Sequence, residues 1–420
     1  MPRGINERNP ERRDDTDADG GSDRPNRKRP DADIEQEIAL RQEEIHQYLH
    51  DRYARRKATV QTKTDSGQVL DWLPLESQVR GGKIASPPSE DVPYEFTDTE
   101  RRALPTRFEL QEPRAEHGPR GTVPLVRKEI DLIRPDVSLN DWLAKGPHAQ
   151  RSAPPDCPRL QQFPQTDSVH KYAFTSQTVP AYGTEGEINA WDPYVEWPDE
   201  FSLGQLALSR GSEDSMQTLE VGHQEYRDLY GDWVPHLFVF YTTNHYTQQG
   251  DNKGGYNQDV DGWVQYSNSI YPEAKSTPLS QFGSAQYVMS IKVQLWEGNW
   301  WVRINGQWIG YYPASLYSAN GLRSQADRVA WYGEVVDSAH DGTTRTDMGS
   351  GHWPYEGWQR CAFMSNLRYQ STAKGAMARY KGNAWASNPM CYAVEEHFSN
   401  TDSWGSYLWW GGSGKNSQCP

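Results

Sequence analysis

The chain divides into two parts of very different composition, and this division limits which part can fold compactly. Residues 1–60 contain almost no Val, Phe or Trp and are dominated by Arg, Asp, Glu, Asn and Pro. Most of the 17 Trp and 23 Tyr lie beyond about residue 170. A segment with so few apolar side chains cannot bury enough surface to offset the entropy lost on ordering. The composition therefore predicts a disordered tail at 1–60 and a core formed by the second half.

One stretch of the tail departs from this description. Over residues 33–57 acidic residues lead, basic residues close the stretch, and apolar residues recur near helical spacing, namely Ile34, Ile38, Ile45, Leu49 and Tyr53. The pattern predicts an amphipathic helix that docks against another part of the chain.

A Pro-rich stretch at 147–168 marks a second boundary. Proline resists both helix and interior strand, so this stretch suits an exposed linker. We therefore divide the chain into the tail at 1–60, a region at 61–146, the linker at 147–168 and a folded domain at 169–420.

Strand patterns dominate the last of these parts. Apolar and polar residues alternate strictly over 289–295, so one face of a strand is buried and the other is wet. Turn residues at 297–299 and the pair Asn305-Gly306 then predict a three-stranded meander. Residues 238–241 are apolar throughout, as in a strand covered on both faces. We predict an all-β fold, an antiparallel β-sandwich preceded by a partly disordered, partly helical segment.

Charge and hydropathy exclude several classes of partner. The formal net charge of −14 argues against nucleic acid, because phosphate binding needs a basic surface. The sequence has no run of about 18 apolar residues for a membrane span, and no apolar segment of the kind a secretory signal needs. We expect neither a nucleic-acid nor a membrane partner, and a complete sandwich needs no second subunit, which predicts a monomer.

The 4 cysteines are Cys157, Cys361, Cys391 and Cys419. They form no CxxC pair, which makes a zinc site improbable. Cys391 and Cys419 could close a C-terminal loop as a disulfide in an oxidising compartment, and two free thiols are the alternative.

Most known catalytic signatures are missing. Met348 stands where a nucleophile elbow around Ser350 needs its first Gly. No His-Glu-x-x-His pair is present for a metallopeptidase. Residues 257–262 resemble the start of a calcium loop, but Asn268 stands where the bidentate Glu is required. We predict neither a metal nor another cofactor.

Two glutamates in Gly- and aromatic-rich strands remain as candidates for chemistry. If residues 219–224 form a strand, Glu220 shares one face with Thr218, Gly222 and Gln224. Glu334 lies in a similar apolar pattern, directly after Gly333. A carboxylate beside a Gly that leaves room for a bound backbone suits a catalytic position. A solvated Glu on an outer face is the ordinary alternative.

Several longer motifs carry a family resemblance. The segments at 241–246, 262–265, 298–301, 310–313, 331–334 and 348–354 resemble, in order and spacing, the neprosin family of glutamic peptidases. The resemblance covers nearly all of residues 170–414. Residues 62–71 and 120–124 look like that family's activation peptide.

The resemblance implies a function and a site. In that family two glutamates on an antiparallel β-sandwich hydrolyse peptide bonds after proline, which identifies Glu220 and Glu334 as the catalytic pair. It implies peptide or protein substrates that contain proline, a precursor that binds its own activation segment, and a secreted protein, although no signal peptide is visible. His223 and Glu225 depart from the family pattern and leave the substrate preference less defined than the catalysis.

A pair of carboxylates has a direct chemical use. Two glutamates a few ångström apart cannot both ionise cheaply, so they share one proton. The ionised member can take a proton from attacking water, and the neutral member can polarise the carbonyl or protonate the leaving nitrogen. We therefore expect activity at acidic pH, and the sequence does not assign the base.

Proline at the cleaved bond offers a rigid ring that aromatic side chains can contact. Trp300, Trp301, Tyr311 and Trp331 are candidates, although we expect most of them in the core or the cleft wall. The prolines of the linker, Pro154, Pro155, Pro158 and Pro164, offer the enzyme its own substrate, so self-processing is a hypothesis.

Two other functions are compatible with a carboxylate-bearing sandwich. Paired carboxylates and exposed Trp also suit a glycoside hydrolase. A non-catalytic binding module that keeps the fold is the second alternative, and His223 and Glu225 favour it.

Overall fold

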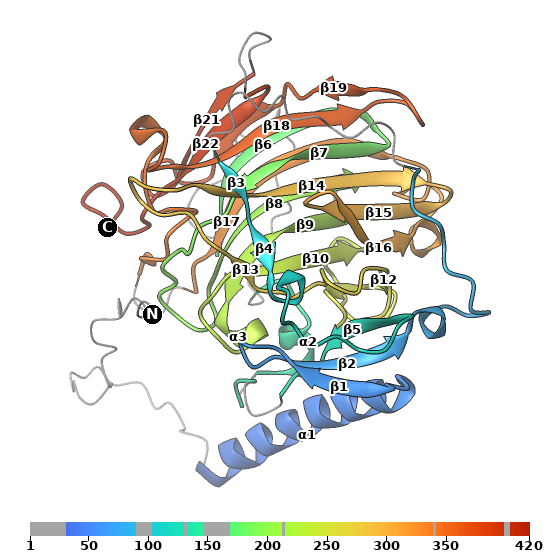
Figure 1. The fold of residues 1–420 in the computed structure, drawn as a ribbon. Helices are drawn as coiled ribbons and strands as arrows, with labels where there is room; N and C mark the ends of the chain where they lie inside the picture. Colours follow the sequence, from blue (N-terminus) through green and yellow to red (C-terminus); the bar gives the residue numbers. More distant parts are fainter. Residues whose placement is uncertain are drawn as a thin grey trace.

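The structure of the chain is a computed structural model that describes residues 31–89, 103–129, 133–135, 137–146, 169–211, 215–338, 342–398 and 404–420. Within these ranges strands far outnumber helices, and Figure 1 shows them stacked in layers with one long helix along the edge. The all-β fold predicted from the strand patterns is confirmed. The predicted tail, apart from its helix, and the whole predicted linker at 147–168 lie outside the described residues.

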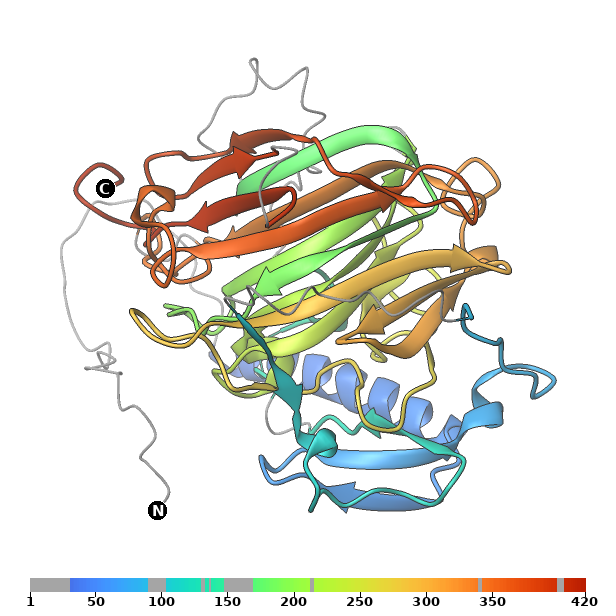
Figure 2. The ribbon, with the colours of Figure 1, turned by 45° about the horizontal axis from the view of Figure 1, so that its top comes forward.

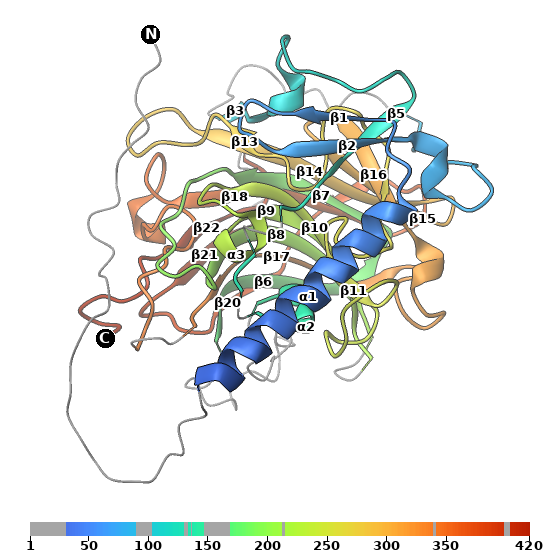
Figure 3. The same ribbon diagram turned by 90° about the horizontal axis from the view of Figure 1, so that it is seen from below.

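The N-terminal region begins with helix α1, Asp31–Arg55. Ile45 and Leu49 are buried one helical turn apart, as the apolar spacing indicates. The ring of Tyr48 packs edge-on against Trp142 of the short helix α2, Leu139–Trp142. Figure 3 shows α1 crossing the molecule with α2 beside it. The helix therefore docks through the face that carries its apolar residues.

A small antiparallel sheet follows α1. Its order is β1-β2-β5, with β1 at Val60–Lys63, β2 at Val69–Pro74 and β5 at Thr122–Val126. Trp72 at its centre is fully buried and donates from its indole nitrogen to Thr62 at 2.8 Å. Figure 2 shows this blue sheet at one side of the larger sheets.

The chain between β2 and β5 joins the N-terminal region to the rest of the molecule. Strand β3, Leu104–Pro105, adds in parallel to β14, and β4, Arg107–Phe108, pairs with β13, Ser276–Thr277. The N-terminal region is thus hydrogen-bonded into the sheets of the C-terminal part.

The first large sheet has seven strands in the order β11-β10-β9-β8-β17-β6-β20. Their bounds are β6 His170–Ala181, β8 Phe201–Arg210, β9 Gln217–Tyr226, β10 His236–Thr242, β11 Gly254–Tyr256, β17 Ala326–Val336 and β20 Asn383–Ala386. The pairs along this path are antiparallel. The short helix α3, Arg227–Tyr230, follows β9 and ends at Gly231. Gly231 has a left-handed φ of 84°, a conformation that glycine adopts without strain because it has no Cβ.

The second large sheet runs β12-β16-β15-β14-β7-β18-β22-β21, with β3 and β19 paired at its side. Its remaining bounds are β7 Gly183–Asn189, β12 Val264–Gln265, β14 Tyr287–Trp296, β15 Asn299–Ile304, β16 Gln307–Pro313, β18 Ala362–Gln370, β19 Met377–Arg379, β21 Ala393–His397 and β22 Tyr407–Gly411. The predicted meander is confirmed as β14, β15 and β16, paired in turn.

The main core lies where the two large sheets face each other. Glycines on one sheet receive large rings from the other: a Cβ on Gly204 or Gly333 would meet Trp410 within 3 Å, and one on Gly186 would meet Trp331. Such interlocking fixes how the sheets stack, because interiors are close-packed. The residues of β8, β9 and β17 that do not enter this core point to the opposite face of the first sheet.

Two of the cysteines form a disulfide. Cys391 and Cys419 are bonded, with their Cα atoms 5.4 Å apart, so the loop considered from the sequence is closed. Cys361 is a buried free thiol, and Cys157 lies outside the described residues.

Candidate active site

The two glutamates singled out by the sequence lie close together on the first large sheet. Glu220 is on β9 and Glu334 on β17, with β8 between them, and both are turned away from the second sheet. Their exposed fractions are 0% and 1%. Both carboxylates bind the same nitrogen: Lys145 Nζ donates to Glu220 Oε2 at 2.6 Å and to Glu334 Oε2 at 2.8 Å. The interpretation of either glutamate as a solvated surface residue is therefore wrong.

Glu220 is held by neutral donors. Thr218 Oγ1 and Tyr246 Oη donate to its Oε1 at 2.7 and 2.6 Å. Gln205 Nε2, from β8, donates to its Oε2 at 2.9 Å and also contacts the hydroxyl of Tyr332. Thr218 and Glu220 are two residues apart on one strand, so the predicted shared face is confirmed. These contacts fix the plane of the carboxylate.

Glu334 is held by a histidine. His170, the first residue of β6, lies with Nδ1 2.6 Å from Glu334 Oε1. Burial alone would raise the pKa of Glu334, but the charge of Lys145 and the hydrogen bond and charge of His170 outweigh it and lower that pKa to about 2. Glu334 is thus an anion over the whole ordinary pH range while Lys145 is present.

Lys145 reaches the pair from the N-terminal side of the molecule. It follows α2, which Ser138 caps by accepting from the backbone N–H of Asp141. Gly146 adopts a φ of 83°, and a Cβ there would meet Val336, Phe201 and His170 within 3.5 Å. Burial would lower the pKa of Lys145, but Glu220 and Glu334 outweigh it and raise that pKa. The chain is therefore shaped to hold a buried ammonium between the two carboxylates.

Aromatic rings surround this cluster, but they are not those proposed from the sequence. Lys145 Nζ lies 5.9 Å from the ring centre of Phe240 and 6.0 Å from that of Tyr332. Tyr172 and Phe174 pack against Tyr332 on the same face of the sheet. By contrast, the four rings proposed as contacts for proline are core residues with exposed fractions of 3% or less: Trp300, Trp301, Tyr311 and Trp331.

The glycines beside the glutamates have a packing role in the fold. A Cβ at Gly222 would lie 2.2 Å from the carbonyl oxygen of Gly204 on β8. A Cβ at Gly333 would lie 2.2 Å from Trp410 of the second sheet. Both glycines thus allow close approach within the fold, and the room they leave for a bound backbone stays a prediction.

His223 and Glu225 point away from the pair. His223 Nε2 lies 2.6 Å from Ser276 Oγ. Glu225 is buried beside Trp191 and Trp410 between the sheets, and burial raises its pKa well above the usual value. The two departures from the family pattern therefore do not alter the surroundings of Glu220 and Glu334.

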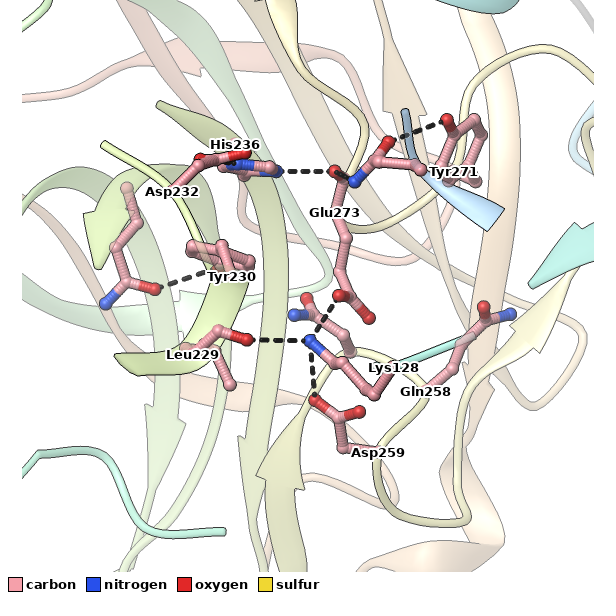
Figure 4. Close-up of polar contacts among 12 residues, drawn as sticks. Lys128, Leu229, Tyr230, Asp232, His236, Gln258, Asp259, Tyr271 and Glu273 are labelled. Atoms are coloured by element: carbon pink, nitrogen blue, oxygen red, sulfur yellow. Dashed lines mark hydrogen bonds and ion pairs between the residues drawn. The ribbon is translucent and has the colours of Figure 1, made fainter. Parts of the chain in front are cut away.

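A second buried lysine ties the N-terminal region to the C-terminal part. Figure 4 shows Lys128 Nζ in contact with the Glu273 carboxylate, 3.0 Å from the carbonyl of Leu229 and 3.5 Å from Asp259 Oδ2. Burial would lower the pKa of Lys128, but Asp259 and Glu273 outweigh it and raise that pKa. Two buried lysines, Lys128 and Lys145, thus attach the N-terminal region to the C-terminal part through polar contacts.

Basic residues of α1 add to this attachment. Arg52, with an exposed fraction of 2%, donates to the carbonyl of Gln258 at 2.9 Å and pairs with Asp251 and Asp261 at 2.8 and 3.1 Å. The acidic turn that resembles a calcium loop is therefore occupied by cationic side chains. Within the described ranges no cluster of three acidic, His or Cys side chains suits a metal, and no helix is long and apolar enough to cross a membrane.

Sequence reasoning missed the groups that contact the glutamates. Lys145, His170 and Gln205 lie on other segments than the glutamates and stand in none of the quoted motifs, whereas Tyr246 ends the motif at 241–246, which gave no sign of its contact with Glu220. Only Thr218, two residues from Glu220, could be placed by strand periodicity.

An antiparallel β-sandwich with a buried pair of hydrogen-bonded glutamates has the fold and the side chains expected of a glutamic-type peptidase. A profile described as Neprosin matches residues 198–413, which include Glu220, Glu334 and most of both large sheets. The chain belongs to the neprosin family, and this membership supports a peptidase of the glutamic type.

Three solved structures are distantly similar to the chain. Scytalido-glutamic peptidase with a peptide-based transition state analogue shares 8% identity over 58% of this chain and 98% of its own, with a TM-score of 0.30. SCP-B of the Eqolisin family, in complex with the tripeptide Ala-Ile-His, shares 8% over 58% and 98%, with a TM-score of 0.27. CG-16, an agglutinin from chicken liver, shares 8% over 40% and 93%, with a TM-score of 0.21. These scores are too low to support an argument about function.

Proposed function

We propose that the chain is the latent precursor of an acid-active glutamic endopeptidase, in which Glu220 and Glu334 are the catalytic pair and Lys145 blocks them. One observation carries the proposal: two buried glutamates of a neprosin-family sandwich share a single lysine from the N-terminal region. A lysine in this position is stabilised because both carboxylates attract its charge and accept its hydrogen bonds, and it occupies the place between them that water and substrate need.

The chemistry follows once Lys145 has left. Two adjacent carboxyls then share one proton. The ionised glutamate takes a proton from water while the water oxygen bonds to the peptide carbonyl carbon. The neutral glutamate protonates the leaving nitrogen, the C–N bond breaks, and one proton passes between the carboxyls to restore the starting state. No group outside the chain is needed for the proton balance.

Acid is the proposed trigger for release. The pKa of Glu334 is lowered to about 2 in the latent chain. A carboxylate with a lowered pKa contributes stability that is complete above its unfolded pKa of about 4.3 and is lost as the pH falls toward 2. The Lys145–Glu334 pair therefore weakens across this acidic window, and the same window leaves one proton on the carboxyl pair.

Cleavage after proline and self-processing form the finer part of the proposal. Lys145 and His170 both contact Glu334. The sequence between these two residues contains Pro154, Pro155, Pro158 and Pro164. A cut after any of them separates the lysine from the strand that carries the histidine. Peptides and proteins with accessible proline are the proposed substrates, and the chain is proposed to act as a monomer because a complete sandwich needs no second subunit.

The test is incubation of the purified full-length chain at pH 3 and pH 7 with proline-containing reporter peptides, followed by mass spectrometry of the products and of the chain itself. We expect cleavage after proline at pH 3 and a cut within 147–168, and both should slow by about 10²-fold or more in Glu220→Gln and in Glu334→Gln.

Glu225→Gln is the matched control, because Glu225 is a buried glutamate on the same strand that faces the other way. It should retain cleavage. Cleavage at sites unrelated to proline would support the peptidase but contradict the proline preference. Release of reducing ends from glycans without peptide cleavage would favour a glycoside hydrolase, and unaltered ligand binding by both Gln variants would favour a binding module.

A further inference from the structure

The two glutamates differ in the kind of group that contacts them. Apart from Lys145, the contacts of Glu220 are hydroxyls and a carboxamide, from Thr218, Tyr246 and Gln205. The contact of Glu334 is an imidazole, whose Nδ1 lies 2.6 Å from Oε1. Hydroxyls and amides can form hydrogen bonds with either a carboxylate or a carboxylic acid, because they can both donate and accept. An imidazole that donates from Nδ1, and that can carry a positive charge, favours the carboxylate.

The position of His170 is well defined by its neighbours. Its exposed fraction is 4%, and its ring stacks on Tyr172 at 6.3 Å and meets Phe201 edge-on at 6.1 Å. The backbone of His170 pairs with Val336 on β17, two residues beyond Glu334. The histidine thus belongs to the same sheet as the glutamates, and a cut at 147–168 would leave it in place after Lys145 is lost.

We propose that His170 is a positioning residue that keeps the negative charge on Glu334, so that Glu334 acts as the general base and Glu220 as the proton donor. This inference rests on the proposed peptidase function and deepens it, because neither the fold nor family membership assigns the two roles.

The charges around the pair support this assignment. Among the residues that the structure describes in contact with Glu334, Lys145 and His170 are the groups able to carry a positive charge. Among the described residues, the titratable groups that interact with the pair or with His170 from the other strands and loops are phenols, namely Tyr172, Tyr246, Tyr256, Tyr312, Tyr317 and Tyr332. Burial raises the pKa of each of the last five well above the usual value, so these phenols remain neutral. After Lys145 leaves, the imidazole next to Glu334 is the group that distinguishes the carboxyls, and the shared proton settles on Glu220.

The first test is the pH dependence of kcat/KM in the full-length chain carrying Lys145→Met, with and without His170→Gln. The Lys145 substitution removes the pH dependence of lysine release. The fall of kcat/KM on the acidic side of its pH profile, the acidic limb, therefore reports the ionisation of the general base. We expect His170→Gln to move that limb to higher pH by about one unit, which is about a tenfold loss at the acidic end and a small change above the limb. An equal loss at every pH would show a structural role only and would overturn the proposal.

His223→Gln is the matched control, because His223 is a buried histidine on β9 that contacts Ser276 and faces away from the pair. It should leave the position of the limb unchanged. His170→Asn provides a second substitution of smaller size if the Gln variant folds poorly, as judged by its thermal melt.

The second test leaves His170 intact and compares Glu220→Gln with Glu334→Gln in the Lys145→Met chain. An amide can replace a neutral carboxylic acid as a hydrogen-bond donor, but it cannot accept a proton as a base. We expect Glu220→Gln to retain measurable turnover, with a loss of about 10²-fold, and Glu334→Gln to fall by about 10⁴-fold. The reverse order would overturn the assignment. If the Lys145→Met parent cleaves no peptide at any pH, the proposed function itself fails, and the role of His170 fails with it.

Discussion

Replacing Lys145 by Met probes the latent state directly, because Met keeps the length of the side chain and removes its charge. The substitution deletes two charge-assisted hydrogen bonds, at 2.6 and 2.8 Å, and leaves two buried carboxylates without a cation. Removing one partner of a buried ion pair costs about 3–5 kcal/mol. We expect a loss of that size in the free energy of unfolding at pH 7.

The loss should depend on pH with a definite sign. The raised pKa of Lys145 and the lowered pKa of Glu334, about 2, mean that the pair contributes fully between about pH 4.3 and the alkaline range. The contribution disappears as the pH falls toward 2, so wild type and variant should converge there.

The assay is urea unfolding, followed by intrinsic Trp fluorescence, at pH 7, 4.5 and 2.5. Lys275→Met serves as a control for removing a lysine from a more exposed ion pair, that with Asp232 at 2.7 Å. A difference between wild type and Lys145→Met that stays the same at pH 7 and pH 2.5 would refute the reasoning, because its origin would then be packing rather than charge.

Three further predictions concern the sandwich. Replacing both Cys391 and Cys419 by Ser should lower the free energy of unfolding by about 3–4 kcal/mol, as measured by urea unfolding, because the bond closes a loop with a sequence separation of 28. Burial raises the pKa of Asp347 to about 7. Its contribution to the free energy of unfolding is therefore complete below its unfolded pKa of about 3.9 and is lost as the pH rises to 7. Asp347→Asn should therefore stabilise the chain by about 1–2 kcal/mol at pH 8 and by little at pH 4, as thermal melts at the two values would show. Gly333→Ala should destabilise by about 1–3 kcal/mol, since its Cβ would lie 2.2 Å from Trp410, and unchanged unfolding would contradict the interlocking of the sheets.

Much of the fold could be predicted because its signals are local. Strict alternation over 289–295 and the Asn305-Gly306 turn fixed the meander β14, β15 and β16 within a few residues. The helical spacing over 33–57 corresponds to α1 at Asp31–Arg55. Strand periodicity also placed Thr218 beside Glu220.

The surroundings of the glutamates could not be predicted in the same way. His170 and Gln205 reach the pair through the order of strands in the sheet, and Lys145 reaches it through the docking of the N-terminal region; periodicity specifies neither. The rings of Trp300, Trp301 and Trp331 could be expected to be buried, but their exact place could not be predicted, for a related reason. Alternation tells that a residue is buried, but it does not tell which of two apolar environments, core or cleft, receives it. The roles of Gly222 and Gly333 likewise depend on which backbone or ring of a neighbouring strand or sheet approaches them.

The most direct test of the account is the rate of hydrolysis of a proline-containing reporter at pH 3–5 by the Lys145→Met chain and by its Glu220→Gln, Glu334→Gln and Glu225→Gln derivatives. The account predicts turnover by the parent and by the Glu225 derivative, and a loss of about 10²-fold or more in each of the other two. Equal turnover by all four chains would contradict the claim that Glu220 and Glu334 form a catalytic pair.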